Sequence, residues 1–376
     1  MELFEQGRSG SIWKYYKDEN VRDIIQPYFA HPIWEMKAGD PLPDMPLDVQ
    51  FEFVNRCNLH CTSCSVDDQR RDKKVLEWDV MERLVDEAAE EGVCYITVCG
   101  LGEATLHPDL FRFFARVRSR KVEKKGLRVM DYMPTLLISN GMWSTAQINA
   151  CLENPPDVIS FSLAGLTDEE FDERRRGIRM DRFRHVLSRL FNERKVVRGP
   201  DGGLSPTIHL STHIYPHEME TRADEVEAFI EEWFEMADIV VIKPTMIHND
   251  KTPPAEFSAH QSLIEKHENL KYTRLAENVY ERTAPCFETS RRLSINSDGE
   301  VWCGHHMSED FGGFLGNVHE NTLREIWHGE PMNAFRRAVR AGRFDREACK
   351  RCGGEIRDFH RDREPELETE LVFRTS

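Results

Sequence analysis

Apolar positions in the first two thirds of the chain alternate between two spacings, which predict strands and helices in turn. Short, nearly continuous apolar runs are typical of buried strands, and longer stretches with an apolar residue every three or four positions are typical of helices. The predicted strands are Val49–Val54, Tyr95–Cys99, Thr135–Ser139, Val158–Leu163, Thr207–Ile214 and Ile239–Lys243. The predicted helices are Trp78–Glu91, Leu110–Val117, Phe171–Phe191 and Arg222–Glu235.

This alternation favours an α/β fold with a parallel sheet that is either open or closed into a barrel. In such folds the chemistry collects at the carboxyl ends of the strands. The residues at these predicted ends are Cys57, Gly102, Glu103, Ser139, Asn140 and Ser162. We therefore expect the functional site at this edge of the sheet.

The pattern changes along the chain and divides it into segments. We expect an N-terminal extension (1–46), a core domain (47–250), a bridging segment (251–284), a small C-terminal domain (285–355) and a charged tail (356–376). Within the small domain, two short apolar runs flank a turn that contains Gly299, which predicts a β-hairpin. The predicted elements there are the hairpin strands Leu293–Asn296 and Glu300–Trp302 and the helices Leu323–Trp327 and Asn333–Ala341.

Composition and charge exclude several classes of protein. The chain has 376 residues and a net charge of −16, whereas a general nucleic-acid binder needs a basic surface that displaces counterions. No apolar run occupies the first twenty residues, and no stretch of about 18 apolar residues occurs anywhere. We therefore expect a cytoplasmic protein that binds neither nucleic acid nor membrane.

Three of the ten cysteines lie close together in the sequence. Disulfides are disfavoured in a reducing compartment, so clustered cysteines there indicate metal binding or catalysis. Cys57, Cys61 and Cys64 have the spacing C-x3-C-x2-C, and three thiolates on one loop can bind three irons of a cubane cluster. A zinc site that includes His60, or three metal-free thiols, are the alternatives.

Four further cysteines lie near the C-terminus. Cys286, Cys303, Cys349 and Cys352 could ligate a second cubane cluster completely, and they could equally hold zinc. The predicted hairpin brings Cys286 and Cys303 together, and the Cys-x2-Cys pair can then close the site. The remaining three cysteines are scattered, and we expect Cys99 to be a buried core residue, with hydrogen donation as its alternative role.

The loop from Asn55 to Cys64, which follows a predicted strand, resembles the signature of radical S-adenosylmethionine (SAM) enzymes. This resemblance covers about residues 48–245 and implies a partial (β/α)6 TIM-like barrel of parallel strands. It also implies a [4Fe-4S] cluster whose open iron chelates SAM. The reduced cluster donates one electron, and SAM breaks to methionine and a 5′-deoxyadenosyl radical that abstracts hydrogen from the substrate.

The resemblance also assigns SAM-binding residues. Gly102 and Glu103 match the Gly-Gly-Glu element after the second strand, where glycine lets the backbone approach the methionine ammonium and the carboxylate neutralises it. Other residues match positions that contact SAM in relatives, and at the Arg-Gly step Arg176 is favoured over Arg175. These further candidates are Asn140, Ser160, Ser162 and Arg176.

Residues 284–354 resemble the C-terminal auxiliary-cluster domain of radical SAM enzymes. The matching residues are Pro285-Cys286, Leu293–Cys303, Leu315–Val318 and Leu323–Trp327. The long form of this domain needs seven or more cysteines, whereas this chain has four after residue 285, so the short "twitch" form fits. The resemblance implies two [4Fe-4S] clusters in all, with the hairpin and helices forming a small iron–sulfur domain.

An auxiliary cluster near the substrate can accept an electron, and among short-form relatives aminocyclitol dehydrogenases use it in this way. We therefore expect an oxidoreductase that oxidises an alcohol of a small amino-sugar-like metabolite to a ketone. An electron donor such as flavodoxin or ferredoxin is implied as the partner. The alternatives are a radical epimerase, a peptide-modifying enzyme and a metal-binding scaffold without SAM chemistry. The candidate general bases at strand ends are His213, Lys243 and His248.

Overall fold

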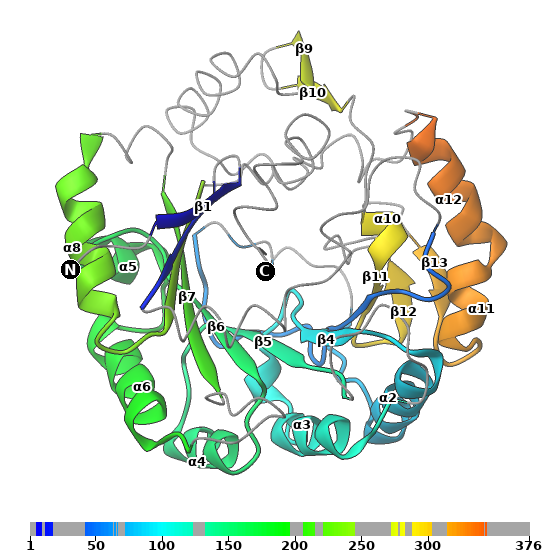
Figure 1. Cartoon of the computed structure of the whole chain (residues 1–376), viewed down its shortest axis with the longest axis horizontal. Coiled ribbons are helices and arrows are strands. Elements are labelled where there is room, and N and C mark those ends of the chain that lie inside the picture. The colour runs from blue at the N-terminus through cyan, green and yellow to red at the C-terminus, as the bar shows by residue number, and fades with distance from the viewer. Residues whose placement is uncertain are drawn as a thin grey trace.

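A curved sheet forms the centre of the computed structural model. The described residues are 5–9, 12–17, 42–62, 64, 66, 72–122, 132–195, 206–214, 221–244, 272–276, 279–282, 288–302, 314–341 and 343. Within them, six strands pair in parallel in the order β8-β7-β6-β5-β4-β3. These strands are β3 (Asp48–Phe51), β4 (Tyr95–Val98), β5 (Thr135–Ser139), β6 (Val158–Ser162), β7 (Thr207–Ile214) and β8 (Ile239–Pro244). The predicted α/β fold with a partial, open barrel is confirmed (Figure 1).

Further strands extend this sheet at both edges. At one edge β2 (Ile12–Tyr16) pairs antiparallel with β8, and β1 (Glu5–Ser9) pairs with β2. At the other edge β11 (Arg292–Ile295) pairs in parallel with β3, and the antiparallel strands β12 (Glu300–Trp302) and β13 (Phe314–Asn317) follow. The N-terminal and C-terminal segments therefore share one hydrogen-bonded sheet with the core. A separate pair consists of β9 (Tyr272–Ala276) and β10 (Val279–Arg282).

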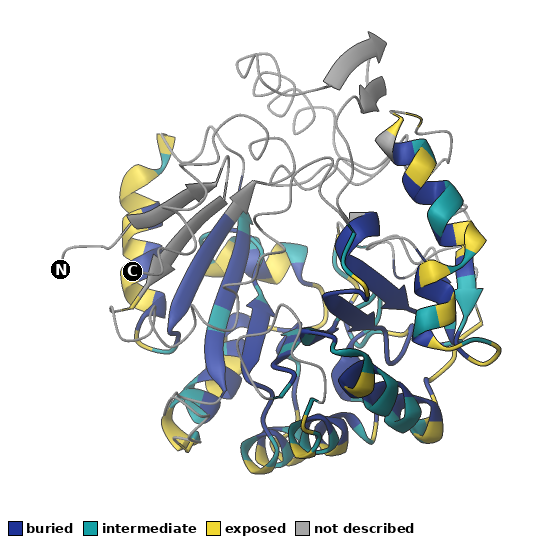
Figure 2. Ribbon diagram, turned by 45° about the vertical axis from the view of Figure 1, so that its right-hand side comes forward, coloured by how far each residue is buried: buried dark blue, intermediate teal, exposed yellow. Residues whose placement is uncertain are grey.

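Helices cover the outer face of the curved sheet (Figure 1). Apolar residues at helical spacing turn toward the strands and charged residues turn outward, as the buried and exposed stripes of each helix show (Figure 2). The helix α2, for example, buries Met81, Leu84, Val85 and Ala88. The covering helices are α2 (Trp78–Glu91), α3 (Leu110–Ser119), α4 (Thr145–Glu153), α5 (Asp168–Arg174), α6 (Met180–Glu193) and α8 (Ala223–Trp233).

The inner face of the sheet is more polar than the outer face. Along β7, Ile208 and Leu210 are fully buried in the core beneath the helices, whereas the alternating residues His209 and His213 are half-buried. Side chains alternate between the two faces of a strand, so His209, Ser211 and His213 share the inner face. The concave side of the barrel therefore presents polar groups at the site edge predicted from the sequence.

The helices differ from the predicted ones in two places. The stretch predicted as one mostly helical segment, Phe171–Phe191, is divided between α5 and α6, because Gly177 adopts a φ of +110°. The helix α4 was not predicted. Its only buried residues are Ile148 and Cys151, so the apolar pattern in its sequence is weak. It begins instead with a capping box in which Ser144 and Gln147 exchange hydrogen bonds.

The predicted hairpin and helices of the C-terminal segment are confirmed. Gly299 takes a φ of +81° in the turn between β11 and β12, a conformation that favours glycine. A short helix, α10 (Glu288–Arg291), precedes β11, and two helices follow β13. These two helices are α11 (Leu323–His328) and α12 (Glu330–Arg340).

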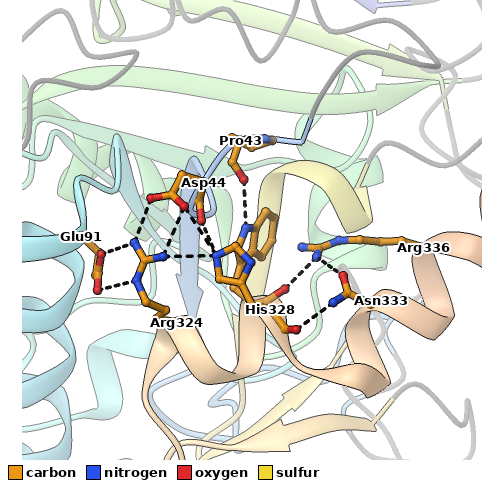
Figure 3. Close-up of polar contacts among 8 residues, drawn as sticks. Pro43, Asp44, Glu91, Arg324, His328, Asn333 and Arg336 are labelled. Carbon is orange, nitrogen blue, oxygen red and sulfur yellow. Dashed lines mark hydrogen bonds and ion pairs between the residues drawn. The ribbon is translucent and has the colours of Figure 1, made fainter.

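A polar cluster fastens α11 to the core (Figure 3). The guanidinium of Arg324 lies between two carboxylates, with Arg324 Nε 2.8 Å from Glu91 Oε1 and Nη2 2.9 Å from Asp44 Oδ2. The ring of His328 also contacts the backbone carbonyl of Asp44 at 2.8 Å. Glu91 ends α2 and Asp44 precedes β3, so the cluster joins the C-terminal helices to the segments that flank the first strand of the barrel.

Candidate functional site

The loop that carries the first three cysteines directly follows β3. Cys57, Cys61 and Cys64 are all half-buried free thiols, and the amide of Cys64 donates to the carbonyl of Cys61 at 3.2 Å. Among the described residues, no three His, Cys, Asp or Glu side chains converge on one metal ion. Four thiolates around one zinc would lie about 4 Å apart, whereas the ligands of a cubane cluster bind separate irons and spread further. Three half-buried thiols on one loop are the donor set that a cubane cluster with one open iron requires.

The sulfur of Cys57 lies among hydrogen-bond donors. It accepts hydrogen bonds from the Leu59 amide and from Asn140 Nδ2, both at 3.4 Å. Burial raises the pKa of the Cys57 thiol to about 11, and the nearby Glu103 carboxylate and Cys61 add to this rise. Since thiolates are the ligands of iron, a bound cluster must replace the Cys57 proton, and the two hydrogen bonds then stabilise the sulfur charge.

Neighbouring segments hold the backbone of the cysteine loop. The amide of His60 donates to the carbonyl of Arg176 at 2.8 Å, and the amide of Thr62 donates to the carbonyl of Arg174 at 3.0 Å. The side chain of Asn58 donates to the carbonyl of Met142 at 3.1 Å. The segments after α5 and after β5 therefore fix the shape of the loop before any ligand binds.

Glu103 lies buried at the centre of the predicted Gly-x-Gly-Glu turn. Its Oε1 accepts hydrogen bonds from Thr105 Oγ1 at 2.7 Å and from Ser139 Oγ at 2.8 Å, and its Oε2 accepts one from the Asn140 amide at 2.8 Å. The Glu103 amide donates to the carbonyl of Arg56 at 2.9 Å. The carboxylate thus links β5 to the turn that follows β4, and Oε2 retains lone-pair capacity for a further donor.

Neighbouring backbone atoms leave no room for a side chain at Gly102. A Cβ atom at this position would lie 1.9 Å from the carbonyl oxygen of Val54 and 2.8 Å from that of Arg56. The strand-end turn and the start of the cysteine loop therefore pack backbone against backbone. This close contact explains why the residue is glycine on steric grounds. The sequence had suggested a different reason, the approach of a ligand to the backbone.

Arg175, rather than Arg176, points into the protein. The Arg175 side chain is buried, its Nη2 donates to the carbonyl of Asn140 at 3.3 Å, and its Nε has no hydrogen-bond partner. The Arg176 side chain is exposed. Sequence analysis favoured Arg176 for the SAM carboxylate, but the geometry favours Arg175, because only its guanidinium has unused donor capacity beside Asn140.

The inner face of the barrel carries several polar groups that lack partners within the described chain. Gln50 Oε1 on β3, Ser211 Oγ on β7 and Ser294 Oγ on β11 are buried without a hydrogen bond. Buried polar atoms normally find partners, so these three mark space for a polar ligand or for water. In β-sheet register, Ser160 pairs with His209, Ser162 with Ser211, and His213 with Lys243.

The structure thus brings together part of the predicted site. Cys57, Glu103 and Asn140 lie in one hydrogen-bonded group, while Ser160, Ser162 and His213 lie along the adjoining inner face. The residues Cys286, Cys303, Cys349, Cys352 and His248, and the side chain of Lys243, lie outside the described part of the chain. Sequence reasoning missed Asn58, whose Oδ1 accepts a hydrogen bond from Asn140 Nδ2 and whose only sequence signal was its position beside Cys57. Ser139, which the sequence placed at a strand end, donates to Glu103 Oε1.

Comparison with protein families identifies two domains. The model of the radical SAM superfamily matches residues 51–204, and the model of an iron–sulfur cluster-binding domain, SPASM, matches residues 286–353. No curated protein shows significant sequence similarity to the chain. In the part of the chain that the structure describes, no helix combines the length and apolarity that crossing a membrane requires.

Solved structures share the fold at low sequence identity. Native anSMEcpe with bound AdoMet (SAM) superposes with a TM-score of 0.52 at 17% identity, covering 87% of this chain and 93% of that one. Streptococcus suis SuiB bound to SAM gives 0.52 at 16% identity and covers 95% and 81%. BtrN in complex with AdoMet and 2-DOIA gives 0.48 at 13% identity and covers 82% and 94%.

The two matched domains define the cofactors of the chain. A radical SAM domain binds a [4Fe-4S] cluster and SAM, and a SPASM domain binds additional iron–sulfur clusters. The first match contains the three half-buried cysteines after β3, and the second contains the four cysteines of the C-terminal segment. The chain therefore contains a radical SAM domain and a C-terminal iron–sulfur cluster-binding domain.

Proposed function

We propose that this protein is a radical SAM dehydrogenase that oxidises a hydroxyl group of a small, polar, amino-sugar-like metabolite to a ketone. The observation that carries this proposal is the polar inner face of the barrel, where Gln50, Ser211 and Ser294 hold buried polar atoms without partners. A ligand with several hydroxyl groups would satisfy these atoms, whereas an apolar ligand would leave them unpaired. The net charge of −16 also favours a cationic substrate such as an amino sugar.

Cys57, Cys61 and Cys64 are the proposed ligands of the SAM-cleaving cluster, and Cys286, Cys303, Cys349 and Cys352 are those of one auxiliary cluster. When bound, the first cluster and SAM supply a 5′-deoxyadenosyl radical, and the auxiliary cluster supplies an acceptor for one electron. Asn140 Nδ2 donates to the Cys57 sulfur and so orients this ligand.

The residues around Glu103 are proposed to bind SAM. Glu103 Oε2 has lone-pair capacity for an ammonium group, and Arg175 Nε is a free donor for a carboxylate. Gly102 lets the backbone pack closely at the same edge, and Asn140 connects the two groups. Ser160 and Ser162 follow on β6, on the same strand face, and are proposed contacts for the ribose.

The proposed oxidation removes one hydrogen atom from the carbon, one proton from the hydroxyl group and one electron. The hydrogen atom goes to the 5′-deoxyadenosyl radical, which becomes 5′-deoxyadenosine. His213 is the proposed proton acceptor, because it lies half-buried at the carboxyl end of β7 on the inner face. Its register partner Lys243 is the second candidate.

The proposal that both domains contribute to one active site is supported by the sheet that they share. The first strand of the C-terminal domain, β11, pairs in parallel with β3, the strand that leads into the cysteine loop. Ser294 on β11 is the register partner of Gln50 on β3, so both domains contribute to the polar inner face. This continuity supports a direct electron-accepting role for the auxiliary cluster.

Because such clusters and free thiols persist in a reducing compartment, we propose that the protein acts in the cytoplasm.

A second candidate is a radical epimerase or a peptide-modifying enzyme. Cys99 is half-buried beside Gln50, whose side chain donates to its carbonyl at 3.2 Å, and a thiol there could donate hydrogen. The fold is also that of SuiB, solved bound to the precursor peptide SuiA, with a TM-score of 0.51 at 15% identity over 89% of this chain and 76% of that chain. These observations make product analysis necessary, because the fold hosts more than one reaction.

Anaerobic reconstitution of wild type and of a Cys57/Cys61/Cys64→Ala triple variant tests the proposal. We expect about eight irons per chain in the wild type and about four in the variant, with distinct EPR signals for two cubane clusters. Wild type should form 5′-deoxyadenosine under strong reductant and one ketone per SAM cleaved when amino sugars are screened. The variant should form neither product.

Other outcomes would redirect the assignment. Deuterium from solvent incorporated into the product without net oxidation would indicate epimerisation, and its loss in Cys99→Ala would identify the hydrogen donor. About four irons and one zinc per chain in the wild type would mean that the C-terminal cysteines bind zinc. The chain would then lack the electron acceptor, and the dehydrogenase assignment would be wrong. Absence of 5′-deoxyadenosine from fully reconstituted protein would contradict SAM cleavage itself.

A further inference from the structure

A buried carboxylate, Glu52, lies where the barrel meets the C-terminal domain. We propose that Glu52 is a positioning residue that fixes the turn after β4, residues 100–103, and makes the position of this turn depend on the C-terminal domain. We call residues 100–103 the SAM-binding turn. The inference rests on the proposed function, since it requires that Glu103 and its neighbours bind SAM.

Glu52 directly follows β3 and is only 1% exposed. The residues on either side of it, Phe51 and Phe53, belong to the apolar core, so alternation along the strand places Glu52 on the inner face with Gln50. Its backbone amide donates to the carbonyl of Ile295 on β11 at 2.8 Å. The carboxylate therefore lies at the seam between the two domains, at the end of β3 that leads into the cysteine loop.

The two oxygens of Glu52 accept hydrogen bonds from different domains. Oε1 accepts from the amide of Leu101, in the SAM-binding turn, at 3.3 Å. Oε2 accepts from the amide of Ser297, in the hairpin turn that follows β11, at 3.5 Å. A charged acceptor strengthens such bonds, and burial strengthens them further. One side chain therefore connects the turn that carries Glu103 to the hairpin turn of the C-terminal domain.

The SAM-binding turn also packs directly against this side chain. A Cβ atom on Gly100 would lie 2.4 Å from Glu52 Cγ and 2.6 Å from Glu52 Cβ, which is closer than two carbon atoms can approach. The glycine at position 100 therefore leaves the room that the Glu52 side chain occupies. A change on either side of this contact must move the other side.

The rest of the SAM-binding turn follows the same segment of chain. Gly102 lies against the carbonyl of Val54, and the amide of Glu103 donates to the carbonyl of Arg56 at 2.9 Å. Val54 and Arg56 make these contacts with backbone atoms, which a substitution does not remove. Glu52 makes its contact with its side chain. The carboxylate is therefore the part of this interface that depends on which residue the sequence supplies.

The position of the SAM-binding turn matters because binding groups must be held within about half an ångström of their working geometry. Leu101, which bonds to Glu52, lies two residues before the proposed SAM ligand Glu103. A shift of the hairpin turn at Ser297 would pass through Glu52 to Leu101 and so to Glu103. The affinity for SAM should therefore respond to changes in the C-terminal domain.

The test changes both sides of the contact in the full, reconstituted chain. Glu52→Gln keeps the shape of the side chain but removes its charge and replaces one acceptor by a donor. Gly100→Ala displaces the Glu52 side chain from the opposite side. Asp48→Asn is the matched control, because Asp48 is also a buried carboxylate on the inner face of β3 and also bonds to β11, through Arg292, but at the other end of the strand.

The KM for SAM and kcat are measured from 5′-deoxyadenosine formation with dithionite, together with iron content and the thermal midpoint. We expect the KM for SAM to rise about tenfold in Glu52→Gln and by a similar factor in Gly100→Ala, with kcat within about twofold of wild type. Asp48→Asn should lower the thermal midpoint at least as much as Glu52→Gln but leave the KM for SAM within about twofold. A merely structural role of Glu52 would not separate these two variants.

The dependence on the C-terminal domain is tested with Gly299→Ala, alone and combined with Glu52→Gln. Gly299 has a φ of +81°, and a Cβ atom there would lie 2.4 Å from the ring of His319, so alanine must shift the hairpin turn. We expect Gly299→Ala alone to raise the KM for SAM about threefold to tenfold. In the Glu52→Gln background it should raise the KM no further, because the connection is already lost.

Three results would overturn the proposal. An unchanged KM for SAM in Glu52→Gln would do so, and an equal rise in Asp48→Asn would show that any loosening of the seam has the same effect. Additive effects of Glu52→Gln and Gly299→Ala would show that the C-terminal domain acts by another route. If wild type formed no 5′-deoxyadenosine with dithionite, the proposed function would fail and this inference with it, so the two failures are distinguishable.

Discussion

At the scale of single residues, neighbouring arginines have different roles because the backbone turns between them. After α5 the chain reaches Gly177, with a φ of +110°, and the turn leaves Arg175 inside and Arg176 outside. Only Arg175 touches the group formed by Asn140, Glu103 and Cys57. The sequence places the two arginines side by side, and the local fold decides which of them can reach a buried ligand.

Arg175→Gln should therefore weaken SAM binding, and Arg176→Gln should not. Loss of a charge-assisted hydrogen bond costs about 1.5–3 kcal/mol, so we expect the KM for SAM to rise about tenfold to a hundredfold in Arg175→Gln. Steady-state formation of 5′-deoxyadenosine with dithionite checks this, since dithionite makes the result independent of donor docking. Equal KM values for the two variants would contradict the role of Arg175.

Gly102→Ala tests the backbone contact at the same edge. A methyl group there would overlap the carbonyl oxygen of Val54, so the turn or the cysteine loop must move, at a cost of about 1–3 kcal/mol. We expect reduced iron content after reconstitution and a lower thermal midpoint. Gly316→Ala is the matched control, because its nearest neighbour is the Ile326 side chain at 3.0 Å, which can rotate. Normal iron content in Gly102→Ala would contradict a tight contact.

At the scale of elements, capping and ion pairs hold helices beside the sheet. At the start of α5, Thr167 and Glu170 form a capping box, and Arg222 at the start of α8 donates to Glu170 Oε1 at 2.8 Å. Burial acts to raise the pKa of Glu170, but bonds from Arg222 and the Leu166 amide outweigh it and lower the pKa below its usual value of 4.5. One carboxylate therefore stabilises two helix starts.

Glu170→Gln should lower stability in a pH-dependent way. Because the folded-state pKa of Glu170 is depressed, its contribution is fully present above pH 4.5 and disappears as pH falls through the lower folded value. We expect the variant to lose about 1–2 kcal/mol at pH 7 and the difference from wild type to shrink below pH 4.5. Thermal midpoints of both proteins between pH 7 and 4 check this. A constant difference across that range would contradict it.

At the scale of the whole molecule, the C-terminal domain is part of the same sheet as the barrel. The parallel pairing of β11 with β3 is reinforced outside the sheet by Arg324, which joins Glu91 and Asp44 (Figure 3). A second bond runs from the Leu323 amide to Glu87 on α2 at 2.9 Å. Within the described residues, the two matched domains are therefore joined both by backbone pairing in the sheet and by side-chain contacts outside it.

Arg324→Ala should loosen this attachment without unfolding the barrel. The Arg324 side chain is about a third exposed, so we expect a loss of only about 1 kcal/mol. Hydrogen exchange should increase in α11 and in the segment before β3, and more SAM should be cleaved per product formed. Arg337→Ala, which breaks an exposed pair with Glu330 on α12 alone, is the control. Identical exchange in both variants would contradict the clamp.

The sequence by itself determined the local elements and the chemistry of the ligands. Apolar spacing predicted β5 and β7 to the residue, because strand and helix periods are properties of neighbouring side chains. The spacing of Cys57, Cys61 and Cys64 indicated a cluster for the same reason, since three ligands on one loop need no distant contact. Gly299 predicted the hairpin turn through its own backbone freedom.

Only the tertiary structure decided which distant segments meet. Nothing local in Ile12–Tyr16 indicates that β2 pairs with β8, and nothing local in Arg292–Ile295 indicates that β11 lies beside β3. Likewise, the inward position of Arg175 and the closeness of Lys74 to the cysteine loop depend on backbone bonds between segments far apart in sequence. Such contacts are set by register and packing across the whole sheet, which no short stretch of sequence contains.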